Sequence, residues 1–112
     1  MREVLITDEC LKFVEESSER TKEKFNYVLQ IITEQRIVHK AFVDKIVKSD
    51  YYELRIKAEN QIRIILFSID HSNFNSSKKV ILLNGFLKKN KSDYKKAIKD
   101  ANAILKKYKN EL

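Results

Sequence analysis

The first third of the chain begins with a strand-like segment and continues as a helix. Glu3–Ile6 is short, apolar and rich in β-branched residues, which is typical of a strand. Thr7 and Asp8 come next, and both are good N-caps for a helix. A short helix is therefore expected from there to about Glu16.

A second helix has the clearest periodicity in the chain. It is expected to start between Ser18 and Thr21. Its apolar residues recur at positions i, i+3, i+4 and i+7, as Phe25, Val28, Leu29 and Ile32. The two helices are expected to form a hairpin that covers a flat surface. Residues 37–50 also have apolar positions at helical spacing, but the segment is short, so it is interpreted as a connector with one or two helical turns.

Three strands are expected in the middle of the chain. Tyr51–Lys57 alternates between apolar and charged residues. Gln61–Ile69 is apolar on both faces, which favours a central position in a sheet. After a polar loop at residues 70–77, Lys79–Asn84 forms the third apolar run. The three strands should pair as an antiparallel meander, with the N-terminal strand at an edge.

The chain ends in a helix with one apolar stripe and lysines on its other faces. Ser92 and Asp93 are the candidate N-caps. The pattern as a whole predicts an α+β fold in the order β-α-α-β-β-β-α, with an antiparallel sheet, an N-terminal helical hairpin and a C-terminal helix. The helices are expected to pack on one face of the sheet, which leaves the other face as a possible working surface.

Charge adds a candidate ligand class to this fold. Residues 1–77 hold 12 Lys and Arg against 13 acids, whereas residues 78–112 hold 11 lysines against three acids. The whole excess of the formal +7 charge therefore lies in the last third of the chain. Such a segregated basic surface is typical of proteins that bind nucleic acid or another polyanion. The alternative is a lysine-rich helix that only faces solvent.

Several classes of site and location are disfavoured. Cys10 is the single cysteine, so no internal disulfide or cysteine-based metal cluster can form, and it is expected to be buried. His39 and His71 are far apart without metal-ligand spacing, and neither a metal nor a cofactor is expected. No apolar run approaches the ~20 residues of a membrane span, and no signal peptide is recognisable. We therefore expect one domain over residues 1–112, in the cytoplasm, with no membrane partner.

A pair of opposed arginines is expected in the first hairpin of the meander. If residues 58–60 form a three-residue loop, Lys57 pairs with Gln61 and Arg55 faces Arg63. Like charges in this position destabilise a sheet by a few tenths of a kcal/mol or more. A bound phosphate would reverse that sign, because arginine binds phosphate through two parallel hydrogen bonds. In the alternative register, shifted by one residue, the two cations would point to opposite sides.

More cations follow the last strand. Lys88, Lys89 and Lys91 leave its end near the same sheet edge, and Tyr94 follows within one helical turn. A cluster of Arg, Lys and Tyr fits RNA cleavage by the adjacent 2′-hydroxyl, which needs stabilisation of charge on the phosphorane more than a metal. Lys or Tyr could carry protons there if their pKa values were lowered by neighbouring cations or burial. Passive RNA binding explains the same residues.

At these positions the sequence resembles the RelE/HigB superfamily of bacterial toxins, and within it the phage-derived branch. The resemblance covers residues 52–98. The shared residues are Tyr52-Glu53-Leu54-Arg55, Arg63, Leu82-Leu83, Gly85-Phe86 and Lys88-Lys89. The resemblance implies a compact sheet with two covering helices, and the toxin of a type II toxin–antitoxin system. It also implies a metal-independent, ribosome-dependent endoribonuclease (an mRNA interferase) that inhibits translation. The implied partners are mRNA on the ribosome and a cognate antitoxin, often with a helix-turn-helix.

The resemblance also implies roles for single residues. The implied catalytic residues are Arg55, Arg63, Lys89 and Tyr94. The implied RNA-binding residues are Lys57, Lys88 and Lys91. The arginines and Lys89 would stabilise the scissile phosphate, and Tyr94 would transfer a proton or stack on a base.

Some positions depart from the pattern of the branch. Asn84 stands where the branch often has His, and Glu53 stands where some relatives have a cation. A Pro and a Glu that are common near Tyr94 and Ala97 are missing. Two other readings therefore stay open beside the interferase: a member of the same fold that binds ribosome or antitoxin without cutting, and a basic structural or DNA-associated protein.

Overall fold

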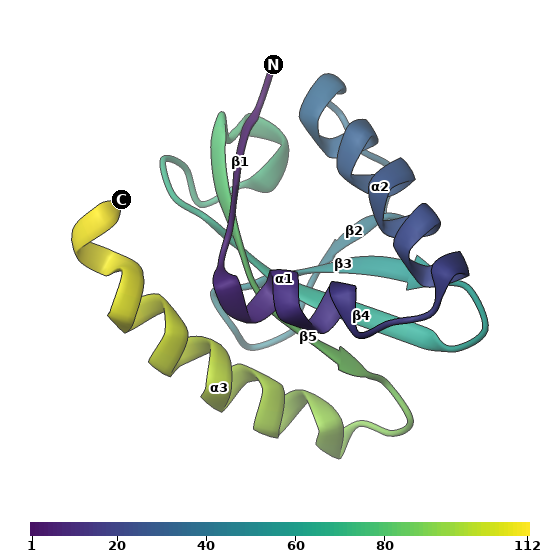
Figure 1. Cartoon of the computed structure of the whole chain (residues 1–112). Helices are drawn as coiled ribbons and strands as arrows, with labels where there is room; N and C mark the ends of the chain where they lie inside the picture. Colours follow the sequence, from purple (N-terminus) through teal and green to yellow (C-terminus); the bar gives the residue numbers. More distant parts are fainter.

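The computed structural model describes residues 1–112, which form three α-helices and one five-stranded sheet (Figure 1). The strands are β1 (Glu3–Ile6), β2 (Val43–Lys45), β3 (Tyr52–Lys57), β4 (Gln61–Ser68) and β5 (Lys79–Leu87). The helices are α1 (Asp8–Glu15), α2 (Glu19–Glu34) and α3 (Ser92–Tyr108), with single 3-10 turns η1 (Phe74–Ser76) and η2 (Lys109–Glu111). None of the helices is both long enough and apolar enough to cross a lipid bilayer.

The first two helices begin where the capping residues predict. The Thr7 hydroxyl accepts a hydrogen bond from the Cys10 amide, and the Ser18 hydroxyl accepts one from the Thr21 amide. Each bond satisfies an amide that has no partner inside its helix. Helix α3 differs, because Lys91 precedes it without a capping bond of its own and the Asn90 side chain accepts the hydrogen bond of the Ser92 amide, so Ser92 and Asp93 are not its N-caps.

The sheet has the strand order β1-β5-β4-β3-β2. Strands β3, β4 and β5 form the expected antiparallel meander, and β1 joins the edge beside β5 as a parallel strand. The chain between these two parallel strands contains the helices α1 and α2 and the strands β2, β3 and β4. The predicted fold class and element order are confirmed.

The strand β2 was not expected. Residues 37–50 contain no helix, only single hydrogen-bonded turns such as the one from His39 to Val43, and Val43–Lys45 pairs antiparallel with β3 at the far edge of the sheet. The helical spacing of the apolar residues has a different cause: Val43 packs against the side of the sheet that α1 and α2 cover, whereas Ile46 packs on the opposite side. Pairing with the next strand along the chain outweighs a weak local helical preference.

The helices do not all lie on one face of the sheet. Helices α1 and α2 pack on one face, over a core that includes Phe25, Leu54 and Ile64. Helix α3 packs on the other face, over Ile65 and Leu83 (Figure 1). The expectation of a fully open second face is therefore wrong. The apolar stripe of α3 needs an apolar surface to bury it, and the two-faced strands β4 and β5 provide that surface.

A β-bulge in β5 changes which side chains reach the α3 face. Ile65 pairs with Asn84 and Leu66 pairs with Leu82, so Leu83 is one extra residue in β5. The extra residue reverses the alternation of the strand. Asn84 and Phe86 consequently face α3, although Leu82 faces α1 and α2.

Gly85, the single glycine, lies where no side chain can fit. A Cβ atom built on Gly85 would lie 2.4 Å from Cδ2 of Phe13, which covers the backbone of β5 from helix α1. Its backbone φ is not positive, so the requirement is steric. The Gly-Phe step of the family pattern therefore has a packing role in this fold.

We predict that Gly85→Ala lowers the free energy of unfolding by about 1–3 kcal/mol, because the methyl group overpacks the contact with Phe13. In a Phe13→Ala background the same substitution should cost less than about 0.5 kcal/mol. Urea denaturation of the four proteins of this double-mutant cycle measures both values. An equal cost in the two backgrounds would show that Phe13 is not the reason for the glycine.

Candidate nucleic-acid interface

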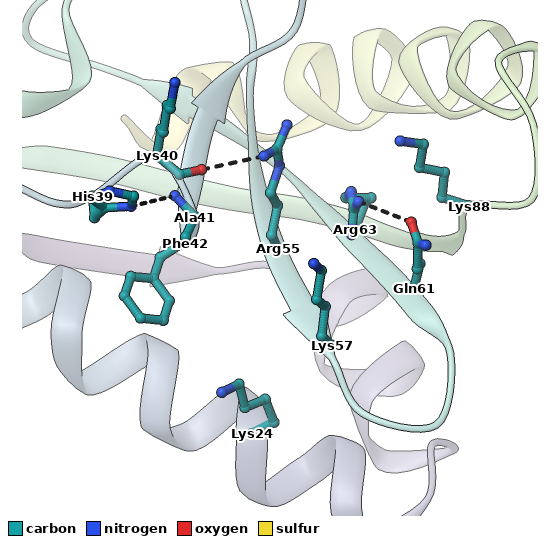
Figure 2. Close-up of a pocket in the computed structure, with 10 residues that line it drawn as sticks. All are labelled: Lys24, His39, Lys40, Ala41, Phe42, Arg55, Lys57, Gln61, Arg63 and Lys88. Carbon is teal, nitrogen blue, oxygen red and sulfur yellow. Dashed lines mark hydrogen bonds between the residues drawn. The ribbon is translucent and has the colours of Figure 1, made fainter.

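The α3 face of the sheet is left open at the β3–β4 hairpin, and a cavity of about 530 Å³ lies there (Figure 2). It is called the basic pocket below. Its lining comes from α2, from the segment before β2, from β3 and β4, and from the residue after β5. The lining residues are Lys24, His39, Lys40, Ala41, Phe42, Arg55, Lys57, Gln61, Arg63 and Lys88.

The hairpin has the register in which the two arginines are opposed. Lys57 pairs with Gln61, and Arg55 is the direct cross-strand partner of Arg63. Both side chains lie on the α3 face beside the pocket (Figure 2). The shared-face interpretation is confirmed, and the register shifted by one residue is wrong.

The carboxylate of Glu53 lies between the two arginines. Its Oε1 atom is 3.0 Å from Nε of Arg55 and 3.4 Å from Nε of Arg63. Glu53 and Arg63 are both buried, with 3% of each residue exposed. Nε of Arg63 has no well-aligned hydrogen bond, although its two other nitrogens donate to the Ile62 carbonyl and the Gln61 side chain. The repulsion between the arginines is thus offset by a carboxylate of the same hairpin, and no phosphate is needed for that purpose.

Tyr94 reaches the same carboxylate from the first turn of α3. Its hydroxyl donates to both oxygens of Glu53, at 3.0 Å for Oε1, and its ring packs edge-on against Phe86. Burial raises the pKa of Tyr94, and the hydrogen bond to Glu53 raises it further, while Arg63 acts in the opposite direction. A phenol with a raised pKa stays protonated at neutral pH, so this environment favours a hydrogen-bond donor over a proton acceptor.

The charges that remain free in the basic pocket belong to lysines. Arg55 has a second ion pair with Asp44, at 3.3 Å, so two carboxylates balance the two arginines. None of the four lining lysines forms an ion pair: Lys24, Lys40, Lys57 and Lys88. No acidic residue lines the pocket. The arrangement is a concave cationic surface, which attracts anions.

The bulge in β5 decides which lysine reaches this surface. Lys88 follows Phe86 by two residues, and its amide donates to the Gln61 carbonyl, which extends the β4–β5 ladder by one bond. Its side chain lines the pocket, with Nζ 5.7 Å from the centre of the Tyr94 ring. Lys89 and Lys91 lie in the exposed loop before α3 and do not line the pocket.

The structure therefore brings together four of the seven residues singled out from the sequence: Arg55, Lys57, Arg63 and Lys88. Tyr94 contacts the same cluster through Glu53, whereas Lys89 and Lys91 stand apart. Sequence reasoning missed Lys24, Lys40 and Gln61. No local signal marks them, because Lys24 is one of several polar residues on α2 and Lys40 lies in a segment whose structure was predicted wrongly.

His39 also lines the basic pocket. Its spacing from His71 disfavours metal binding, which is the only role weighed for it from the sequence. Its Nδ1 atom accepts a hydrogen bond from the Ala41 amide at 2.9 Å, which fixes the ring and leaves Nε2 as the protonated nitrogen of the neutral form. Nowhere in the chain do three or more His, Cys, Asp or Glu side chains lie close enough together to hold a metal ion.

Comparison with known proteins gives the family. The family described as "Phage derived protein Gp49-like" matches residues 12–106, which is most of the chain. The chain belongs to this family. No curated protein sequence is significantly similar to this Gp49-like protein.

Solved structures with the same fold come from Escherichia coli. The intact RelBE toxin–antitoxin complex contains a chain with a TM-score of 0.59 at 14% identity, and the match covers 80% of the Gp49-like protein and 100% of that chain. A mutant of the toxin RelE in the free state gives 0.58 at 15% identity, with 88% and 95% covered. A crystal structure of the isolated RelE toxin gives 0.55 at 15% identity, with 88% and 97% covered. The predicted RelE-like fold is confirmed.

We predict that Glu53→Gln lowers the free energy of unfolding by about 3 kcal/mol, because it leaves a buried arginine without its counter-charge. Added phosphate should then stabilise the variant more than the wild type, since an anion can take the place of the carboxylate. Urea denaturation with and without phosphate measures both effects. Glu59→Gln in the exposed hairpin loop is the matched control and should change stability by less than about 0.5 kcal/mol. A Glu53→Gln protein as stable as that control would contradict the bridging role.

A second prediction concerns pH. The pKa of Tyr94 is raised above its ordinary value of about 10 in the folded protein. The resulting stability is therefore present below pH 10 and is lost as the pH rises through the folded pKa. Tyrosinate absorbance of the wild type minus that of Tyr94→Phe should give a pKa above 10, and Glu53→Gln should lower it. A value at or below 10 in the wild type would exclude the described environment.

Proposed function

We propose that this Gp49-like protein is the toxin of a type II toxin–antitoxin system and acts in the cytoplasm as an endoribonuclease on mRNA bound to the ribosome. The observation that carries the proposal is the basic pocket. Six Lys and Arg side chains and no acid line one cavity at the open end of the sheet. A phosphodiester backbone is the polyanion that such a surface suits, and the RelE-like fold supports the same choice.

The proposed reaction needs no resident metal. The 2′-oxygen of a ribose attacks the adjacent phosphorus, the bond to the 5′-oxygen breaks, and a 2′,3′-cyclic phosphate forms. Negative charge grows on the non-bridging oxygens in the transition state, so pre-arranged cations accelerate this step. Arg55 and Arg63 are held rigidly for this role by Glu53, and Lys57 and Lys88 add mobile charges from both sides of the hairpin.

Proton transfer completes the reaction, because the 2′-hydroxyl loses a proton and the 5′-oxygen gains one. His39 is assigned to this proton transfer, because its imidazole lines the pocket and the Ala41 amide fixes its ring. Tyr94 enters the proposal as the residue that positions Glu53 and, through it, the arginines. Lys89 and Lys91 would contact the backbone beside the pocket from the loop before α3.

A member of the fold that binds RNA without cleaving it is the second candidate. Two observations favour it: carboxylates already balance both arginines, and the pKa of Tyr94 is raised rather than lowered. Such a protein would keep the cationic surface and lose the chemistry. The mRNA experiment below separates the two candidates.

The proposed partner is a cognate antitoxin. One of the matching structures is a toxin–antitoxin complex. An antitoxin segment with acidic residues would be attracted to the unpaired lysines of the basic pocket and would block access of RNA.

We predict that brief expression of the wild type arrests growth and produces new mRNA 5′ ends, which sequencing of those ends detects. The double variant Lys57→Ala/Lys88→Ala should reduce cleavage by about 100-fold, because two cations of the phosphate site are lost. Lys12→Ala/Lys78→Ala removes the same charge at exposed positions outside the pocket and should cleave like the wild type. RNA binding without new ends would favour the non-cleaving member, and equal loss in both double variants would refute the assigned site.

A further inference from the structure

A second depression adjoins the basic pocket between α2 and the end of β3. It has a volume of about 440 Å³ and shares Lys24 and Lys57 with the basic pocket. Its other lining residues are Arg20, Glu23, Tyr27 and Ala58. Three cations and one acid thus surround it. A chain that leaves the basic pocket past Lys24 and Lys57 enters this depression directly.

Tyr27 is the unusual residue of this depression. It lies on α2 outside the apolar stripe that faces the core, and 53% of it is exposed. Its hydroxyl has no hydrogen-bond partner within the protein, so neither burial nor a polar contact explains an aromatic residue at this position. A single exposed tyrosine is common on protein surfaces, so its neighbours decide the interpretation.

Those neighbours hold the Tyr27 ring in place and give it a positive surrounding. Phe42, which lines the basic pocket, packs against it edge to face, with ring centres 6.2 Å apart at 68°. Nζ of Lys24 lies over the ring, 4.9 Å from its centre. The ring is therefore pre-oriented next to the basic pocket, with the flexible side chain of one of the shared lysines over it.

We propose that Tyr27 is a stacking platform for an unpaired base of the RNA strand, beyond the phosphate bound in the basic pocket. Lys24, Lys57 and Arg20 would neutralise the phosphates on either side of that nucleotide. Aromatic rings interleaved with cations are the arrangement that binds single-stranded nucleic acid without sequence readout, because every base has a face that can stack. An acidic peptide would need the cations but has no planar group for the ring, so RNA is the occupant that uses both features.

The inference rests on the proposed function only in taking the strand to be RNA. The inference also gives the direction in which the RNA strand leaves the basic pocket. The strand runs toward α2, where the second depression lies, and not toward α3. The same inference assigns a function to α2, which otherwise covers the core.

The chain contains no tryptophan, so Tyr27→Trp creates a single fluorescent reporter at the proposed platform. The probe is a ten-nucleotide 2′-O-methyl oligouridylate, which cannot be cleaved by its own 2′-oxygen. Stacking should quench the reporter with a saturable dependence on probe concentration. An abasic oligonucleotide of the same length should not quench it, since it carries phosphates without bases. Equal quenching by the abasic probe would overturn the proposal.

Binding of the labelled probe, measured by fluorescence anisotropy, gives the energetic test. Tyr27→Ala should weaken binding by about tenfold, within the range of one stacked base, whereas Tyr27→Phe should stay within about twofold of the wild type. Asn26→Ala, the exposed neighbour on α2, is the matched control and should bind like the wild type. Tyr27→Ala binding as tightly as that control would refute the platform. Poly-glutamate that quenches the reporter where the oligonucleotide does not would show a protein partner in its place.

Failure of the inference and failure of the proposed function give different results. New mRNA ends from the wild type, together with unchanged probe binding by Tyr27→Ala, would remove the platform and keep the endoribonuclease. Quenching of the Tyr27→Trp reporter, together with no new mRNA ends, would keep the platform and remove the cleavage.

Discussion

The buried carboxylate of Glu53 is the interaction on which the open end of the sheet depends. Two arginines face each other across the β3–β4 hairpin, and the carboxylate between them offsets their repulsion. The same carboxylate accepts the hydroxyl of Tyr94 and so fixes where α3 starts on the sheet. Since α3 packs from that contact toward β5 and β1, the β3 side stays uncovered. The basic pocket is the space that results.

This arrangement separates rigid charges from mobile ones. Arg55 and Arg63 are tied into ion pairs, and their positions are set by the hairpin and not by a ligand. The lysines around them are unpaired, come from four different segments, and can adjust to a bound backbone. Affinity for a polyanion would then come mainly from the lysines, while the arginines supply a fixed geometry at one phosphate. Such a site would suit an extended polyanionic strand better than a small anion, and a second depression that shares two of the lysines lies beside it.

One extra residue in β5 decides which side chains of the last strand reach the basic pocket. Without the bulge at Leu83, strict alternation would turn Phe86 and Lys88 toward α1 and α2. With it, Phe86 supports the ring of Tyr94 and Lys88 enters the pocket. The bulge also places Gly85 under Phe13, where the absence of a side chain is required. The Gly-Phe step and the placement of Lys88 thus have one geometric origin.

The sequence by itself determined the fold class, the order of the main elements and the approximate starts of the first two helices, because apolar periodicity and capping are local properties. It favoured the opposed arginines through the length of the hairpin loop and left the shifted register open. The short strand β2, the placement of α3 on the opposite face, and the position of Lys88, rather than Lys89, in the basic pocket were decided only in three dimensions. The strand β2 depends on pairing with its neighbour β3, and the placement of α3 depends on packing against strands from earlier in the chain. The position of Lys88 depends on a bulge that no residue type predicts. Tertiary structure also placed Glu53, which stands where some relatives have a cation, between the two arginines.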